Sequence, residues 1–151
     1  LSPDRYEMLT LGQETLAPFS RADSEGRPVW RLPGSASTKL PFLSYASGAY
    51  MARLVEHILK AAPQPPQLNL VYETDMAEGL KAMALEGHGL AFLPASSVKK
   101  DVRAKRLAPA GEPGAWETTM DVRIVRERPQ SARGVKPGAA ALWEHLAVQE
   151  V

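Results

Sequence analysis

Two carboxylates and a serine are the residues of this chain best placed for chemistry. Glu73 and Asp75 follow the apolar run Leu70–Tyr72 two positions apart, as an acid–base pair can. More often, one carboxylate of such a pair caps a helix and the other supports it. Ser47 stands between an expected strand and helix, but its surroundings, YASGA, lack the GxSxG pattern of a nucleophilic serine. We therefore expect Ser47 to cap a helix and to touch a ligand, and we predict that the chain is not an enzyme.

Metal and nucleotide sites are not predicted. The three histidines, His57, His88 and His145, lie far apart, HExxH is absent, and there is no cysteine. Gly87-His88-Gly89 resembles half of a dinucleotide fingerprint, but it follows a helix and precedes a strand, which is the reverse of the Rossmann order. We expect a structural role for this turn, no cofactor and no metal.

Methionines and a basic run are two further candidates. Met51 and Met76 each fall in the first turn of an expected helix after a strand. One expectation is that both methionines fill gaps in the core. The alternative is that they are redox candidates, whose oxidation to the sulfoxide would make a cleft more polar. The basic run contains Lys99, Lys100, Arg103, Lys105 and Arg106. We expect a solvated helix face there, with phosphate contact as the alternative.

The elements that position these residues follow a strand–helix–strand order. Leu40–Tyr45 is an apolar strand, and the helix expected to start near Ser47 presents one apolar face: Tyr50, Met51, Leu54, Val55, Ile58 and Leu59. After the strand Leu70–Tyr72, Asp75 and Glu78 resemble a capping box, with Thr74 as the other candidate cap. A strand at Leu90–Leu93 follows Gly87, which suits a left-handed helix end. Parallel units of this kind bind ligands at the carboxyl ends of their strands.

The flanking segments have weaker patterns. Strands are expected at Tyr6–Leu11 and Glu14–Arg21, the latter interrupted by Pro18, with a loop over Ala22–Lys39. Further along, we expect a short basic helix capped by Ser96 or Ser97, extended chain at Leu107–Pro109, a strand with alternating Met120, Val122 and Ile124, and a final helix from Ala139 presenting Leu142, Trp143 and Leu146.

Composition limits the class of protein. The 151 residues are 44% hydrophobic and 23% charged with a net charge of +1, which is typical of a globular chain and argues against a wholly basic nucleic-acid-binding surface. No run reaches the roughly 18 apolar residues of a membrane span, and LSPDRYEM is not a signal peptide. The absence of cysteine fits a cytoplasmic protein, and a start at Leu1 suggests a processed or excised fragment.

The order of these motifs resembles a known family. ETDMAEGLKAMALEGHGLAFLPASSVKKDVRAKRLAPA is similar to the C-terminal signature of LysR-type transcriptional regulators: an acidic residue, a helix, a Gly-x-Gly turn, an apolar strand ending in Leu-Pro, a helix and a short strand. LPFLSYASGAYMARLVEHIL looks most like the hypochlorite-responsive members of that family. The resemblance covers Leu40 to about Ala110 well and the flanks loosely.

This resemblance implies an α/β effector-binding region with the fold of periplasmic binding proteins, as one complete lobe plus part of a second. Residues 40–110 would form the second subdomain, residues 1–39 the last strands of the first subdomain and the crossover, and residues 111–151 the return strand and last helix. The family's effector cleft would be lined on this side by Ser44, Tyr45, Ser47, Gly48, Tyr50, Glu73, Thr74, Asp75 and Met76. The family's helix-turn-helix is missing here, so DNA would be bound only through that N-terminal domain. Self-association to a dimer or tetramer is also implied.

The leading hypothesis is therefore a ligand- or oxidant-sensing regulatory domain of a bacterial LysR-type regulator. A solute-binding protein of a transport system is the first alternative, and a small α/β enzyme using Glu73, Asp75 and Ser47 is the second. Partial positive charge at helix N-termini favours an anionic effector. The nearby Glu73 and Asp75 argue against a bare dianion and leave small polar or aromatic molecules open.

Overall fold

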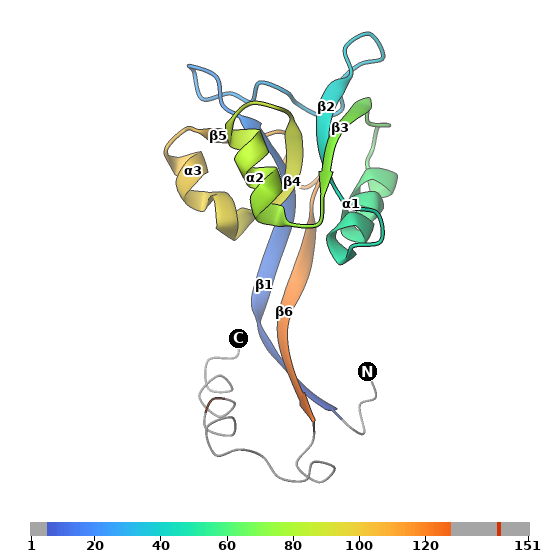
Figure 1. Cartoon of the computed structure of the whole chain (residues 1–151), viewed down its shortest axis with the longest axis vertical. Helices are drawn as coiled ribbons and strands as arrows, with labels where there is room; N and C mark the ends of the chain where they lie inside the picture. Colours follow the sequence, from blue (N-terminus) through green and yellow to red (C-terminus); the bar gives the residue numbers. More distant parts are fainter. Residues whose placement is uncertain (1–5, 128–141, 143–151) are drawn as a thin grey trace. The chain divides into compact units, whose positions relative to one another are not determined.

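A computed structural model describes residues 6–127 and residue 142 (Figure 1). The chain divides into two compact units, one made of Leu1–Glu14 with Met120–Val151 and the other of Thr15–Thr119. The elements of the described part are β1 (Tyr6–Arg21), β2 (Leu40–Tyr45), α1 (Tyr50–Ala61), β3 (Leu68–Thr74), α2 (Ala77–Leu85), β4 (Leu90–Pro94), the 3₁₀ turn η1 (Ala95–Val98), α3 (Lys99–Arg103), β5 (Leu107–Pro109) and β6 (Thr118–Glu127).

One mixed sheet organises these elements. Its strand order is β3-β2-β4-β1-β5, and β6 pairs with β1. Strand β2 runs parallel to both β3 and β4, whereas β1 runs antiparallel to β4 and β5. The predicted strand–helix–strand order is thus confirmed as two parallel crossovers, β2-α1-β3 and β3-α2-β4. The carboxyl ends of β2, β3 and β4 consequently lie at the same edge of the sheet.

The apolar runs of the sequence become the centre of this sheet. Leu90, Ala91, Phe92 and Leu93 of β4 are all buried, as expected of a strand covered on both faces. The rings of Phe42 and Phe92 meet edge to face, with centroids 6.2 Å apart. In contrast, β3 is an edge strand on which Leu70, Val71 and Tyr72 remain exposed.

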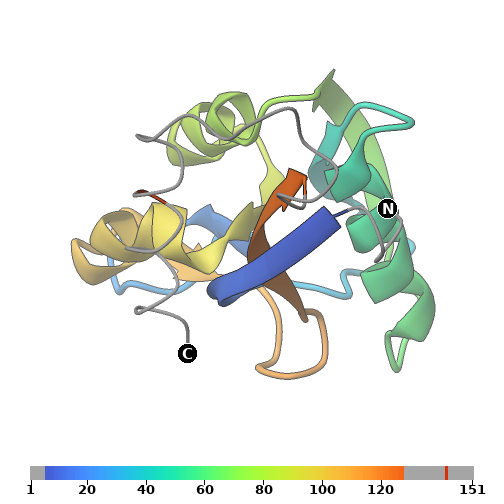
Figure 2. The ribbon, with the colours of Figure 1, turned by 90° about the horizontal axis from the view of Figure 1, so that it is seen from below.

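Helices α1 and α2 lie on opposite sides of strands β2 and β3 in both views (Figures 1 and 2). Helix α1 buries Val55 and Ile58, while α2 buries Leu80 and Ala84. Val55 and Ile58 belong to the apolar face predicted for the helix after Ser47, so the helical spacing was correct at the centre of α1. The prediction was wrong for Tyr50, which is 59% exposed because it is the first residue of α1, away from the centre of the packed face.

The region around Pro18 differs from the sequence-based expectation. Tyr6–Arg21 is one continuous strand. The prediction of separate strands at Tyr6–Leu11 and Glu14–Arg21, the latter interrupted by Pro18, was therefore wrong. Proline fixes φ near −65°, which extended chain tolerates, and it lacks only the amide donor. The Pro18 carbonyl still accepts a hydrogen bond from the Ala110 amide at 2.9 Å.

Gly87 and Gly89 each have a structural reason. Gly87 adopts φ +86° at the end of α2, where a left-handed residue closes a helix, as predicted. At Gly89, a Cβ atom would lie 2.7 Å from the Pro41 carbonyl oxygen, so the backbone approaches β2 too closely for any side chain. The glycines therefore fix the turn from α2 into β4.

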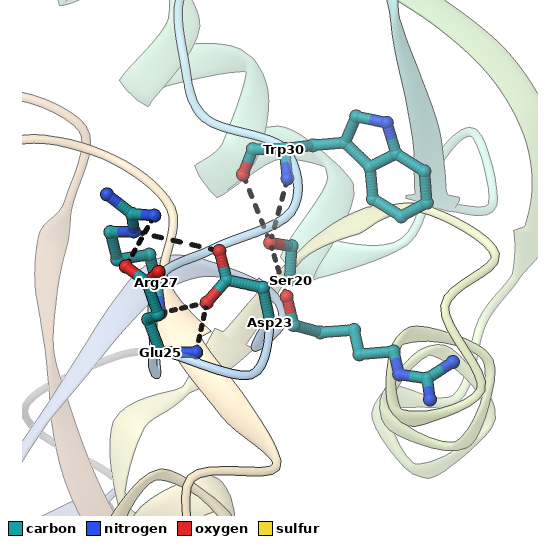
Figure 3. A network of polar contacts seen from close by, with 6 residues as sticks. Ser20, Asp23, Glu25, Arg27 and Trp30 are labelled. Carbon is teal, nitrogen blue, oxygen red and sulfur yellow. Dashed lines mark hydrogen bonds and ion pairs between the residues drawn. The ribbon is translucent and has the colours of Figure 1, made fainter.

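The loop after β1 is held by a buried hydroxyl and an exposed carboxylate (Figure 3). Fully buried Ser20 donates from Oγ to the Trp30 carbonyl at 3.0 Å, and it accepts from the Trp30 amide at 3.3 Å. Asp23 Oδ1 accepts from the amides of Glu25 and Arg27. These two amides, led by that of Arg27, lower the pKa of the Asp23 carboxyl below its ordinary value. The loop is thus an ordered part of its unit.

The remaining elements agree with the sequence in part. The basic helix is present as α3, but its N-cap is Val98 and Ser96 and Ser97 lie within η1, so the cap predicted at these serines was wrong. The extended segment Leu107–Pro109 is confirmed as β5, and the alternating Met120, Val122 and Ile124 lie in β6. The final helix expected from Ala139 lies outside the described residues apart from Leu142, which is helical and exposed. Within the described ranges, no helix is long and apolar enough to cross a membrane.

Candidate functional site

Most of the residues predicted from sequence to line a site lie where β2 and β3 end. In the parallel register, Ser44 lies opposite Glu73 and Tyr45 opposite Thr74. Beyond the strand ends, the Ala46 amide donates to the Thr74 carbonyl at 2.8 Å. The two strand–helix junctions are therefore joined by backbone contacts, and the polar residues of both lie at one sheet edge.

Glu73 and Ser47 meet across these junctions. The backbone N–H of Ser47 donates to Glu73 Oε1 at 3.0 Å, and both residues are exposed. This contact places a carboxylate beside the loop that leads into α1. A negative charge near a helix N-terminus is favourable, but the first turn of α1 contains no acidic residue. Glu73 of the neighbouring strand β3 supplies a negative charge close to this helix end. Glu73 therefore supports the loop before the helix, as the supporting member of the predicted carboxylate pair would.

The prediction that Ser47 caps a helix was wrong. Helix α1 begins at Tyr50, and its N-cap is Ala49, which forms no side-chain cap. Gly48 has φ +89°, and the Ala49 amide closes a turn onto the Ala46 carbonyl at 3.1 Å. The residues directly after Ser47 were expected to be the first of the helix. They form this turn instead, so α1 starts later than predicted.

The capping box predicted at Asp75 and Glu78 is also absent. Helix α2 begins at Ala77 with Met76 as N-cap, so Glu78 is one position too early for a box. Thr74 is not the N-cap either, although its Oγ1 accepts a hydrogen bond from the Met76 amide at 3.4 Å. Asp75 is exposed between these two residues.

Tyr45 points into the core and not out of the sheet edge. Its side chain is buried, and its hydroxyl donates to the Phe92 carbonyl at 2.8 Å. Burial raises the pKa of the Tyr45 phenol from 10.0 to about 12. Tyr45 therefore joins β2 to β4 at neutral pH and positions the residues that follow it.

The other predicted contact residues surround this centre. Ser44 Oγ donates to the Tyr45 carbonyl at 3.0 Å, so its hydroxyl is engaged by the backbone. The Tyr50 ring is exposed and lies 6.0 Å from the guanidinium carbon of Arg53. Met76 is 63% exposed, whereas Met51 is half-buried. Of the two redox candidates, Met76 is thus the more accessible to an oxidant.

The histidines stand apart from this edge. His57 is exposed on α1, and exposed His88 lies 3.2 Å from the carboxylate of Glu86. His145 falls outside the described residues. In the part of the chain that the structure describes, no three His, Cys, Asp or Glu side chains form a group that could hold a metal ion.

Sequence reasoning missed a buried ionic network behind the basic run. Asp101, only 8% exposed, lies 3.4 Å from Lys81 Nζ and accepts from Arg106 Nε at 3.2 Å. Lys81 Nζ also donates to the Ser97 carbonyl at 2.8 Å, which attaches η1 to α2. The i,i+5 spacing of Asp101 and Arg106 crosses a helix end and gives little signal. The Lys81 contact depends on tertiary structure alone.

One known protein family matches this chain over almost its whole length. The pattern of the family described as LysR substrate binding domain matches residues 1–149. The chain belongs to this family. Its periplasmic-binding-protein-like α/β fold, as predicted, is that of the regulatory domains of LysR-type transcriptional regulators, which are generally not enzymes.

Curated relatives of this LysR domain are longer proteins. It is 28% identical over 102 residues to the HTH-type transcriptional regulator YjiE of Escherichia coli strain K12, covering 68% of this chain and 32% of the relative. It is 26% identical over 102 residues to the HTH domain-truncated transcriptional regulator QseD of Escherichia coli O157:H7, covering 68% and 40%. The match therefore spans well under half the length of either relative.

Solved structures share the fold of the LysR domain. The regulatory domain of HypT from Salmonella typhimurium, in its apo form, superposes with a TM-score of 0.82 at 22% identity, covering 99% of this chain and 66% of that one. DarR of Vibrio fischeri in complex with DNA gives a TM-score of 0.81 at 24% identity, covering 97% and 46%. At these identities the likeness establishes the fold alone.

Proposed function

We propose that this LysR domain senses a small anion or an oxidant for a bacterial transcriptional regulator. DNA would be bound by an N-terminal domain outside this chain, in the cytoplasm. The effector would shift the population of two domain arrangements, and self-association would transmit that shift to the DNA-binding domains. Residues 40–110 would provide the second effector-binding subdomain, with residues 1–39 and 111–151 as connecting and returning parts of the first.

The observation that carries this proposal is the contact between Ser47 and Glu73. It joins two strand–helix junctions at the edge where parallel sheets bind ligands. An effector that touches both junctions would act on this contact and on the Ala46–Thr74 bond, which join the junctions beyond the paired residues of β2 and β3. The proposed contact residues are Ser44, Ser47, Gly48, Tyr50, Glu73, Thr74, Asp75 and Met76, with Tyr45 holding the edge from inside.

An anion is the effector class that we propose for this edge. A solved structure of the HypT regulatory domain of Salmonella typhimurium is bromide ion-bound. In this LysR domain, the Ser47 amide already holds the negative charge of Glu73. A bound anion would therefore replace or repel the Glu73 carboxylate, and this repulsion gives a direct test.

Replacing Glu73 with Gln should strengthen anion binding. The substitution keeps an oxygen that can accept from Ser47 but removes the charge, and two unit charges 4 Å apart in water interact by about 1 kcal/mol. We expect about a five-fold gain in bromide affinity, measured by isothermal titration calorimetry at constant ionic strength. The matched control is Glu56→Gln, because Glu56 is an exposed carboxylate on α1 paired with Lys60 at 2.9 Å. Equal affinities in both variants would remove the anion site from this edge.

An oxidant-sensing role, as proposed from the resemblance to hypochlorite-responsive regulators, predicts a response that depends on methionine. Met76 should be oxidised before Met51, because its side chain is the more exposed. Mass spectrometry of peptides after limited hypochlorite treatment gives the order, and the melting temperature gives the structural response. The double substitution Met51→Leu/Met76→Leu should abolish that response. A variant that responds like the unmodified chain would exclude these two methionines as the switch.

A further inference from the structure

A hollow lies on the unit Thr15–Thr119, and neither Ser47 nor Glu73 lines it. It has a volume of about 420 Å³ and is lined by Phe19, Ala95, Lys99, Val102 and Arg103. Phe19 comes from β1, Ala95 from η1, and Lys99, Val102 and Arg103 come from α3. Its size is within the range of small-molecule pockets, which are mainly apolar with a few polar groups at fixed places.

Two cations stand at the rim of this hollow. Lys99 and Arg103 are four residues apart on α3, so both side chains lie on the same side of the helix. Both are exposed, and among the described residues neither has a carboxylate partner. Long basic side chains of this kind can cover apolar surface with their methylene stems and keep their charged ends in water.

Helix α3, which carries these two cations, is held in place by contacts of Asp101. Asp101 projects from the same helix into the network with Lys81 and Arg106. Lys81 also bonds to Ser97 in η1. The only carboxylate of α3 is therefore already engaged and does not neutralise Lys99 or Arg103. The contacts of Asp101 with Lys81 and Arg106 thus hold the helix on which Lys99 and Arg103 lie.

A neighbouring hollow limits the charge that a ligand can carry. It has a volume of about 330 Å³, shares Phe19 and Ala95 with the first, and has Glu112 and Glu117 in its lining. A long dianion would place its second charge near these carboxylates. The combined lining favours an apolar body over Phe19 with a single negative charge at α3.

We propose that this hollow is a binding site for an amphipathic monoanion, a small carboxylate with an apolar tail, distinct from the effector site at Ser47 and Glu73. The carboxylate lies between Lys99 and Arg103, and the tail covers Phe19, Ala95 and Val102. Lys99 and Arg103 belong to the basic run of the sequence. A solvated helix face was expected for this run, with phosphate contact as the alternative.

Hexanoate, acetate and 1-hexanol, titrated into the ¹⁵N-labelled chain at constant ionic strength, test the site by NMR. Hexanoate should shift the amides of Ala95, Lys99 and Val102 saturably. Because each buried CH₂ group strengthens binding about four-fold, acetate should bind at least ten-fold more weakly. Uncharged 1-hexanol should also bind more weakly than hexanoate. Equal binding of acetate and hexanoate would overturn the proposal.

Two double variants that remove the same charge test whether Lys99 and Arg103 hold the ligand. Lys99→Ala/Arg103→Ala should weaken hexanoate binding about ten-fold, whereas Lys100→Ala/Lys105→Ala changes the net charge equally and removes no lining residue of this hollow. Glu73→Gln should leave the hexanoate-induced shifts of the Ala95, Lys99 and Val102 amides unchanged, because Glu73 does not line this hollow, and this separates the hollow from the anion site proposed above. Equal losses in the two double variants, or amide shifts confined to Ser47 and Glu73, would show that no such site exists.

Discussion

At the scale of single residues, Tyr45 shows how a polar side chain near the proposed site became part of the core. Its hydroxyl reaches the Phe92 carbonyl, and burial raises the pKa of the phenol to about 12. The unfolded chain has the lower pKa, near 10, so this group favours the folded state fully below pH 10. That contribution is lost as pH rises from about 10 to 12.

Replacing Tyr45 with Phe should therefore lower the free energy of unfolding by about 1–2 kcal/mol at pH 7, because the Phe92 carbonyl loses its donor. The variant should also show a shallower decrease in the free energy of unfolding above pH 10. Urea denaturation at a series of pH values measures both effects. Tyr72→Phe is the control, since Tyr72 lies exposed on the edge strand. An alkaline decrease identical in Tyr45→Phe and the unmodified chain would contradict the assignment.

At the scale of elements, β3 is the part of the sheet most open to a partner. It is an edge strand, and Leu70, Val71 and Tyr72 are 57%, 49% and 38% exposed. A register shift opposite Phe42 and Leu43 leaves Val71 without a partner residue on β2. Exposed apolar edges of this kind favour pairing with another chain, which supports the proposed self-association.

A charge on this edge should weaken self-association. We expect Val71→Lys to raise the dissociation constant of the proposed self-association at least five-fold, because lysine must be desolvated in the contact. Val29→Lys is a matched control: Val29 is 48% exposed, but it lies in the loop after β1. Sedimentation velocity over a concentration series measures the constant. Equal effects of the two substitutions would exclude β3 as the contact.

At the scale of the whole molecule, the sheet is completed by a strand from the N-terminal part of the chain. Strand β1 lies between β4 and β5, so Phe19 pairs with Ala91 on one side and Pro109 on the other. The unit Thr15–Thr119 therefore contains the end of β1 as well as the two parallel crossovers. Phe19 also lines the hollow at η1 and α3, so a site there depends on a strand distant in sequence from α3.

The sequence by itself determined the local elements and the edge at which polar residues gather. Apolar periodicity predicted β2, α1, α2 and β4, and Gly87 marked the end of α2, because these signals arise within a few residues of one another. Parallel crossovers then required the ends of β2 and β3 to lie at one edge.

Only the tertiary structure decided which groups touch at that edge. Neighbouring strands selected the Phe92 carbonyl as partner of Tyr45, and the turn at Gly48 delayed α1 so that Glu73 meets the Ser47 amide. The insertion of β1 next to β4 and the joining of Lys81 to Asp101 likewise depend on contacts between distant segments. Local periodicity carries no information about such pairings, since they are set by packing of the whole sheet.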